Sequence, residues 1–346
     1  MRPWIVLAVL ALGCDHRDAP VASPGLAEPL ACRAQLDPEE LLPPDALIVG
    51  HYDMARERRF APEVSKADAA GPRALVPSST AEAARLVWVG LAAACELDED
   101  FLECAWVAMD REEEVTVVLS GEGIGGEREL RCIQRRLARY QEELLDPEAI
   151  VADGCGLRLR GDDWEGFAPH DDLLVVGTAE AVAKARLAWS SGRGSPPRHL
   201  LPGRRSRSTY VWAAVDVAAL LSPEEIDRAL REASTDPTPF IDLRTVELEA
   251  KLGRRYSLHL GGRFGNEADA RGAAAAIQAL LDAPPPRLPG WAIEMLERVE
   301  LEHEDAAVEV SVTLQRRRAH ELGLLPEQTE ARQAPALPWL LLALGD

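Results

Sequence analysis

Two short motifs carry residue types that could support hydrolytic or metal chemistry. His51-Tyr52-Asp53 places an imidazole and a carboxylate on one face of an expected strand, because side chains two residues apart in a strand point the same way. His170-Asp171-Asp172 offers the same groups in a polar turn. An imidazole beside a carboxylate can transfer protons, so either motif could serve a hydrolase. The second half of the chain keeps the acid of the first motif as Asp216 but has Ala214 in place of the histidine, which favours a structural role for Asp53. The second motif has no third ligand at metal spacing, and clustered aspartates are also typical of surface turns.

The segment Gly121–Gly126 matches the GxGxxG pattern of dinucleotide-binding turns, and it lies between an expected strand and an expected helix. The strand before it should pair as a hairpin with its predecessor, whereas the dinucleotide motif belongs to a parallel βαβ unit. Gly261–Gly265 also places glycines between a strand and a helix. The turn itself therefore accounts for the glycines, and we expect no nucleotide cofactor.

Acidic residues form one further candidate site. Asp98-Glu99-Asp100 with Glu103 offers oxygen ligands for Ca²⁺, but it lacks the glycine and the spacing of an EF-hand loop. The chain contains no GxSxG nucleophile motif. We therefore expect no metal and no catalytic residues.

Composition narrows the possible partners. The chain has 346 residues, 47% of them hydrophobic, which is enough for two domains with real cores. Its formal net charge of −20 argues against nucleic acid, because binding to phosphates needs a basic surface. The functions that composition leaves open are binding of a small ligand, binding of a protein, and enzymatic activity.

The N-terminus has the pattern of an export signal. Arg2 precedes a nine-residue apolar run, Trp4–Leu12, which is too short to span a bilayer. The ending Leu10-Ala11-Leu12-Gly13-Cys14 resembles the lipobox of bacterial lipoproteins. In that family the cysteine thiol receives a diacylglycerol and the chain is cut just before it. The resemblance implies a lipid anchor on Cys14 and a place in the bacterial cell envelope, facing the periplasm or on the surface. The alternative is an ordinary signal peptide with an incidental cysteine.

An exported chain lies where disulfides persist. Five cysteines follow Cys14: Cys32, Cys95, Cys104, Cys132 and Cys155. Sequence proximity predicts that Cys95 pairs with Cys104 and that Cys132 pairs with Cys155, each closing a short loop. Cys32 would then remain unpaired in the tether.

The elements that must position these residues recur in the same order in the two halves of the chain. Each half reads strand, helix, strand, strand, helix, strand, strand. Ile48–Ala55 also resembles Val211–Ala218 in local sequence. The pattern predicts an α+β fold of two tandem modules, each a largely antiparallel sheet with helices packed on one face.

Composition shifts divide the chain. The expected parts are a signal peptide (1–13), a tether (14–40), a first α+β module (41–191), a basic Gly/Pro linker (192–208), a second α+β module (209–332) and an apolar C-terminal tail (333–346). The tail is too short to cross a membrane and is expected to dock on the second module.

The function that we expect is non-enzymatic: a membrane-anchored envelope lipoprotein that binds a ligand or partner or fills a structural role. One alternative is an envelope hydrolase, which requires the two His/Asp motifs to meet in one cleft. The other is a carrier of lipid or of a small apolar ligand, which requires a large apolar cavity.

Overall fold

A computed structural model of the chain describes ten stretches of the sequence. They are residues 37–60, 95, 101–137, 150–153, 156–160, 165–191, 194–201, 208–232, 240–284 and 290–321. Several sequence predictions lie outside these residues: the signal segment with Cys14, the tether with Cys32, the helix before Cys95, the acidic turn 98–100, Cys155 and the tail 333–346.

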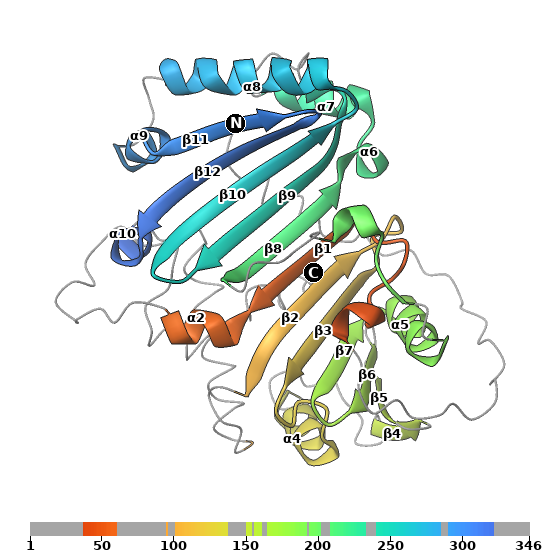
Figure 1. Ribbon diagram of the computed structural model, residues 1–346. Helices are drawn as coiled ribbons and strands as arrows, with labels where there is room; N and C mark the ends of the chain where they lie inside the picture. Colours follow the sequence, from red (N-terminus) through yellow and green to blue (C-terminus); the bar gives the residue numbers. More distant parts are fainter. Residues whose placement is uncertain are drawn as a thin grey trace.

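In the described stretches, twelve strands form one sheet in which all neighbours run antiparallel (Figure 1). The spatial order is β11-β12-β10-β9-β8-β1-β2-β3-β7-β6-β5-β4. The strands are β1 (Ile48–Asp53), β2 (Leu102–Met109), β3 (Val115–Gly121), β4 (Ile150–Asp153), β5 (Gly156–Arg160), β6 (Glu165–His170), β7 (Leu173–Gly177), β8 (Thr209–Asp216), β9 (Leu243–Leu252), β10 (Arg255–Phe264), β11 (Val299–Glu304) and β12 (Ala307–Gln315). Strand β1 pairs with both β2 and β8, so the two halves of the chain share the sheet.

The helices are short and several have clear caps. They are η1 (Pro38–Leu41), α2 (Met54–Phe60), α4 (Glu127–Leu137), α5 (Ala179–Ser191), η3 (Arg198–Leu200), α6 (Val217–Leu220), α7 (Pro223–Glu232), α8 (Glu267–Asp282), α9 (Gly290–Leu296) and α10 (Arg316–Glu321). At α7, Ser222 and Glu225 form a capping box, each accepting a hydrogen bond from the backbone N–H of the other. Asn266 accepts from the N–H of Asp269 at the start of α8. The fold is therefore α+β, as the sequence predicted.

The sheet has two faces, which we name after one residue on each. Tyr52 lies in register with Ala105 of β2 and Val211 of β8 on the Tyr52 face. Trp106 lies in register with His51 and Val118 on the opposite Trp106 face.

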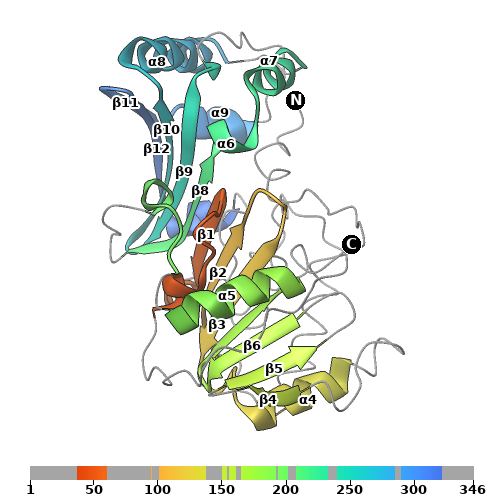
Figure 2. The same ribbon diagram turned by 90° about the vertical axis from the view of Figure 1, so that its right-hand side faces the viewer.

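Helices cover both faces of the first half of the sheet, which corrects the prediction of one covered face. Leu130 of α4 and Met54 of α2 belong to the cluster on the Tyr52 face, whereas Val182 and Trp189 of α5 belong to the cluster on the Trp106 face. Figure 2 shows α5 lying against this half of the sheet. The physical reason is visible in the strands. β2, β3 and β7 contain apolar runs at residues 105–109, 117–119 and 173–176, so both faces of these strand segments must be buried.

On the second half of the sheet, helices α8 and α10 cover the Tyr52 face. Val308, Val312 and Leu314 of β12 point to the Tyr52 face and are buried against helices α8 and α10. On the Trp106 face the row that begins at Trp212 becomes polar across the next strands. It continues through Glu249, His259, Ser311 and Glu300. This alternation of apolar and polar residues is what a sheet with one solvated face requires.

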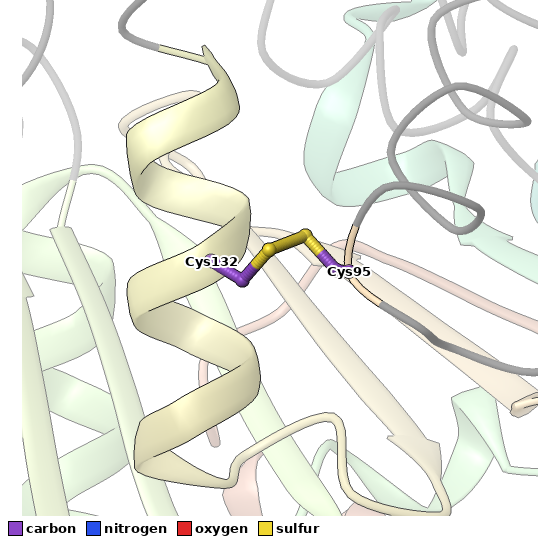
Figure 3. The surroundings of a disulfide bond; sticks show 2 residues. All are labelled: Cys95 and Cys132. Atoms are coloured by element: carbon purple, nitrogen blue, oxygen red, sulfur yellow. A yellow bond between two sulfur atoms is a disulfide. The ribbon is translucent and has the colours of Figure 1, made fainter.

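The cysteine pairing differs from the prediction. Cys95 is bonded to Cys132 of α4, with 5.6 Å between their Cα atoms (Figure 3), and Cys104 is a free thiol. The predicted Cys95–Cys104 and Cys132–Cys155 pairs are therefore wrong. The reason is the period of two along β2: Cys104 lies on the Trp106 face, whereas α4 packs on the Tyr52 face.

Several elements were not predicted. Strand β6 contains Gly166 and Pro169, which weaken a strand signal, yet Phe167 is fully buried within it. Helix α2, which is polar in composition, was not predicted either. Part of the expected linker packs on the body, since Leu200 is fully buried in the same cluster as Trp106. No described helix has the length and apolar character needed to cross a bilayer.

Candidate functional site

A cleft of about 290 Å³ opens where β3 ends and the β6–β7 turn begins. Its lining residues come from the ends of five elements and include three carboxylates. They are Pro38, Glu103, Ser120, Gly121, Glu122, His170, Asp172 and Leu173. The cleft therefore combines two of the motifs that the sequence analysis singled out, the glycine loop and the His-Asp-Asp turn.

The glycine loop lies directly on the His-Asp-Asp turn, and three of its N–H groups donate hydrogen bonds to that turn. The N–H of Gly121 donates to the carbonyl of Asp172 at 3.1 Å, and that of Gly125 donates to the carbonyl of Asp171 at 2.6 Å. The N–H of Gly123 donates to Asp172 Oδ1 at 3.1 Å. A phosphate-binding loop presents such N–H groups to its ligand, so this loop lacks the geometry of a dinucleotide site.

Close packing explains why glycine is needed here. A Cβ on Gly125 would lie 2.2 Å from the carbonyl oxygen of His170, and one on Gly121 would lie 1.9 Å from that of Phe101. Strand β3 also has antiparallel neighbours on both sides, β2 and β7. The glycines therefore permit a turn that packs on the next strands.

His170 and Asp172 are not arranged as an acid–base pair. His170 Nδ1 accepts a hydrogen bond of 3.2 Å from the N–H of Asp172, so a neutral ring carries its proton on Nε2. A catalytic triad needs the reverse, with Nδ1–H donating to a carboxylate. In this geometry the two residues shape the turn and present polar atoms to the cleft.

His51 and Asp53 have separate structural contacts. The His51 ring lies against Trp106, with 4.4 Å between ring centroids. Asp53 Oδ1 accepts from the N–H of Arg56 at 2.7 Å and so caps the start of α2. Asp216, the equivalent acid in the second half, caps α6 through the N–H of Ala219 at 3.0 Å. The acid at the end of each first strand thus holds the following helix.

The two His/Asp motifs do not meet. His51 and Asp53 lie on β1, and the His170 turn precedes β7, with β2 and β3 between them. Strand spacing of about 4.8 Å places β1 and β7 about 14 Å apart. Of the acidic candidates for calcium, Glu103 lies at the cleft, and residues 98–100 are outside the described part of the chain.

A second acidic cluster, which sequence reasoning missed, already contains a cation. Carboxylate oxygens of Asp45, Asp110 and Glu112 lie together. Lys184 Nζ contacts Asp110 Oδ2 at 2.6 Å and Asp45 Oδ2 at 3.5 Å. Partial burial lowers the pKa of Lys184, but the hydrogen bond and charge of Asp110 outweigh that effect and raise it. Lys184 therefore neutralises the position that a metal ion would occupy.

A buried glutamate near the centre of the sheet was also missed. Glu57 of α2 is 4% exposed, and its carboxylate accepts a hydrogen bond from the Tyr52 hydroxyl. Burial raises its pKa to about 7, although the Tyr52 hydrogen bond and the Arg58 charge act in the opposite direction. Nearby, burial raises the pKa of Tyr256 to about 12. The available signal was the spacing of Met54, Glu57 and Arg58, which places them on one face of a helix.

Helix α2 links the two halves of the sheet around this glutamate. Arg58 Nη2 donates to the carbonyl of Leu102 on β2 at 2.6 Å, and Arg56 Nη1 donates to that of Leu252 on β9 at 3.1 Å. Arg316 of α10 donates to the carbonyl of Phe60 at 3.0 Å. A change in the charge of Glu57 would therefore act at the junction of the two halves.

Comparisons with known proteins give a distant structural likeness. No family model matches the chain, and no curated protein matches it. Solved structures described as crystal forms III and I of TP0453 each align with a TM-score of 0.45 and 11% identity over 85% of this chain and 99–100% of theirs. Crystal form IV aligns with a TM-score of 0.44 over 84% of this chain and 98% of the other.

Proposed function

We propose that this chain is an exported envelope protein, anchored to a membrane by lipid on Cys14, whose folded body has a non-enzymatic binding role. The observation that carries the proposal is the Cys95–Cys132 disulfide within the body. Disulfides persist in oxidising compartments outside the cytosol, so this bond supports the export that the N-terminal sequence implies. A lipid on Cys14 would leave residues 15–36 as the connection to the body.

The cleft beside β3 is the described feature best suited to contact a partner. Glu103, Glu122 and Asp172 give it three carboxylates, in a chain of net charge −20. These groups favour a small cationic ligand or a cationic side chain of a partner. The test is thermal stabilisation of the full chain by organic amines, measured for wild type and for Glu122→Gln. Equal stabilisation of both proteins would show that the amines do not bind in the cleft.

A non-enzymatic role is supported by the separation of the two His/Asp motifs and by the use of Asp53 as a helix cap. The hydrolase alternative required convergence of these groups in one cleft. The carrier alternative required a large apolar cavity, whereas the cleft beside β3 is small and has polar walls. Neither alternative gains support from the described part of the chain.

The body is best explained as two tandem modules. From the centre outward, the first half runs β1, β2, β3, β7, β6 and the second half runs β8, β9, β10, β12, β11. In both halves the third strand leads to a helix, α4 or α8, and the last strand lies beside the third. Among the described strands, β4 and β5 extend the first half without a counterpart in the second. This matched order supports a duplication, and superposition of the two halves in an experimental structure tests it.

The decisive experiment for the anchor is a matched pair of cysteine variants. Cells expressing wild type, Cys14→Ser or Cys32→Ser are given a labelled fatty acid. Label is expected in wild type and in Cys32→Ser, and it should be absent from Cys14→Ser, which should remain uncut or become soluble. Label that persists in Cys14→Ser would refute the anchor.

A further inference from the structure

The second half of the sheet carries a continuous apolar row on its Tyr52 face. One residue from each of five neighbouring strands contributes to it, in register: Ala213, Leu248, Leu260, Val310 and Leu301. We call this set the apolar row. Across five strands at about 4.8 Å spacing it extends about 19 Å.

The apolar row lies between two buried clusters and is itself only partly covered. On one side, Val312 and Leu314 are buried in the cluster that includes Ala319 of α10. On the other side, Val308 is buried against α8. Leu248, Leu260 and Val310 belong to neither cluster, and Leu260 is 39% exposed. The helices that cover the two ends of this face therefore leave an apolar strip between them.

The chain itself supplies a matching segment close by. Helix α10 ends at Glu321 on this same face, where Ala319 is fully buried. The sequence continues for 25 residues beyond α10 and contains Trp339–Leu344, WLLLAL. No charged residue lies between Arg332 and Asp346. We infer that the apolar row is the docking surface for this C-terminal segment.

Reach and size are compatible with this assignment. The 18 residues from Glu321 to Trp339 can span about 60 Å when extended, which is several times the length of the apolar row. Six extended residues cover about 20 Å, close to the 19 Å of the row. The segment is uncharged, so it docks without placing a charge on an apolar surface. A covalently attached segment also needs no second molecule to reach the surface.

The test compares one substitution on each side of the contact with a matched control. Leu260→Asp places a charge in the apolar row, and Leu341→Asp places one in the tail without altering the body. Leu187→Asp is the control, because Leu187 is 68% exposed on α5, which packs on the other face. Hydrogen exchange of peptides covering 336–345 is measured on the full chain by mass spectrometry.

The expected result is at least tenfold protection of these amides in wild type and in Leu187→Asp, with loss of protection in both Leu260→Asp and Leu341→Asp. Leu341→Asp should also increase the fluorescence of the dye ANS at least threefold, because the apolar row becomes exposed. Exchange at the unprotected rate in wild type overturns the inference, as does protection that Leu260→Asp leaves unchanged.

Other occupants give distinct results, and each of them overturns the inference. Protection that is lost on dilution, with a dimer in sedimentation, assigns the apolar row to a second copy of the chain. Protection that appears only with added phospholipid vesicles assigns the tail to the membrane. These outcomes are independent of whether Cys14 carries lipid, because the chain is tested without a membrane first.

Discussion

Glu57 makes the stability of this protein depend on pH in an unusual direction. This residue is 4% exposed, and burial raises the pKa of its carboxyl group from the ordinary 4.5 to about 7. The folded protein therefore binds this proton more tightly than the unfolded chain does. The resulting stabilisation is fully present below pH 4.5 and is lost as the pH rises to 7. Most paired carboxylates have the opposite effect, because their pKa is lowered on folding.

The magnitude follows from the size of the pKa change. Each pKa unit corresponds to 1.36 kcal/mol, so the full effect is about 3 kcal/mol, of which about 2.5 kcal/mol falls between pH 5 and pH 8. Glu57→Gln removes the titrating group and keeps its size and its ability to accept from the Tyr52 hydroxyl. We expect the free energy of unfolding of Glu57→Gln, relative to that of wild type, to increase by about 2.5 kcal/mol as the pH rises from 5 to 8.

Urea unfolding at a series of pH values measures this difference directly. Glu300→Gln is the matched control, since Glu300 is exposed on β11, and its free energy of unfolding should stay within about 0.5 kcal/mol of wild type at every pH. Tyr52→Phe should steepen the pH dependence, because the Tyr52 hydrogen bond stabilises the ionised form of Glu57. A difference between Glu57→Gln and wild type that is constant from pH 5 to pH 8 would refute the reasoning.

Three further predictions concern Cys95, Cys104 and the ion pair between Lys184 and the buried Asp110. Cys95→Ser removes a disulfide between residues 37 apart in the sequence and should lower the free energy of unfolding by about 4 kcal/mol. Cys104→Ser, which removes a free thiol, should lower it by less than about 1 kcal/mol. Equal losses of the two variants in urea unfolding would contradict the observed pairing. Burial raises the pKa of Cys104 from 9.0 to about 11, so its alkylation at pH 8 should be about 100-fold slower than in the unfolded chain. The alkylation rate should rise about tenfold per pH unit, and a rate that does not change with pH would contradict the raised pKa. Lys184→Met leaves the buried Asp110 carboxylate without its cation and should cost about 3 kcal/mol in urea unfolding at pH 7; a loss below about 1 kcal/mol would show that the pair contributes little.

The periodic elements of the fold could be predicted from the sequence. The alternation Val308, Val310, Val312, Leu314 determines which face of β12 is buried, and the structure places Val308, Val312 and Leu314 in clusters on the Tyr52 face. The hairpin of β2 and β3 was predicted for equally local reasons, and the capping box at α7 also depends on residues three apart. Local patterns succeed where the interaction that stabilises an element lies within a few residues of it.

The missed elements depend on contacts between distant parts of the sequence. Helix α2 is polar in composition, and its buried Glu57 and Arg58 find partners on β1 and β2. Strand β6 is stabilised by pairing on both sides, with β5 and β7, despite its glycine and proline. No window of a few residues contains that information.

The candidate site, like the fold, could be predicted only where the signal is local in the sequence. The sequence identified the glycine loop and the His-Asp-Asp turn separately, and it predicted that the glycines serve the turn. It could not show that the two lie on one another, because Gly123 and Asp172 are 49 residues apart. The prediction of the disulfide pairing was wrong for a related reason. Proximity in sequence favoured Cys104 as the partner of Cys95, but Cys104 lies on the opposite face of the sheet from α4, which carries Cys132.

The most direct test of the proposed anchor is the mass of the N-terminal peptide from the protein isolated from membranes. The proposal predicts a peptide that begins at Cys14 and carries a diacylglycerol, with further acylation of its amine. A peptide that begins at another residue with an unmodified Cys14, or one that retains Met1–Gly13, would contradict it.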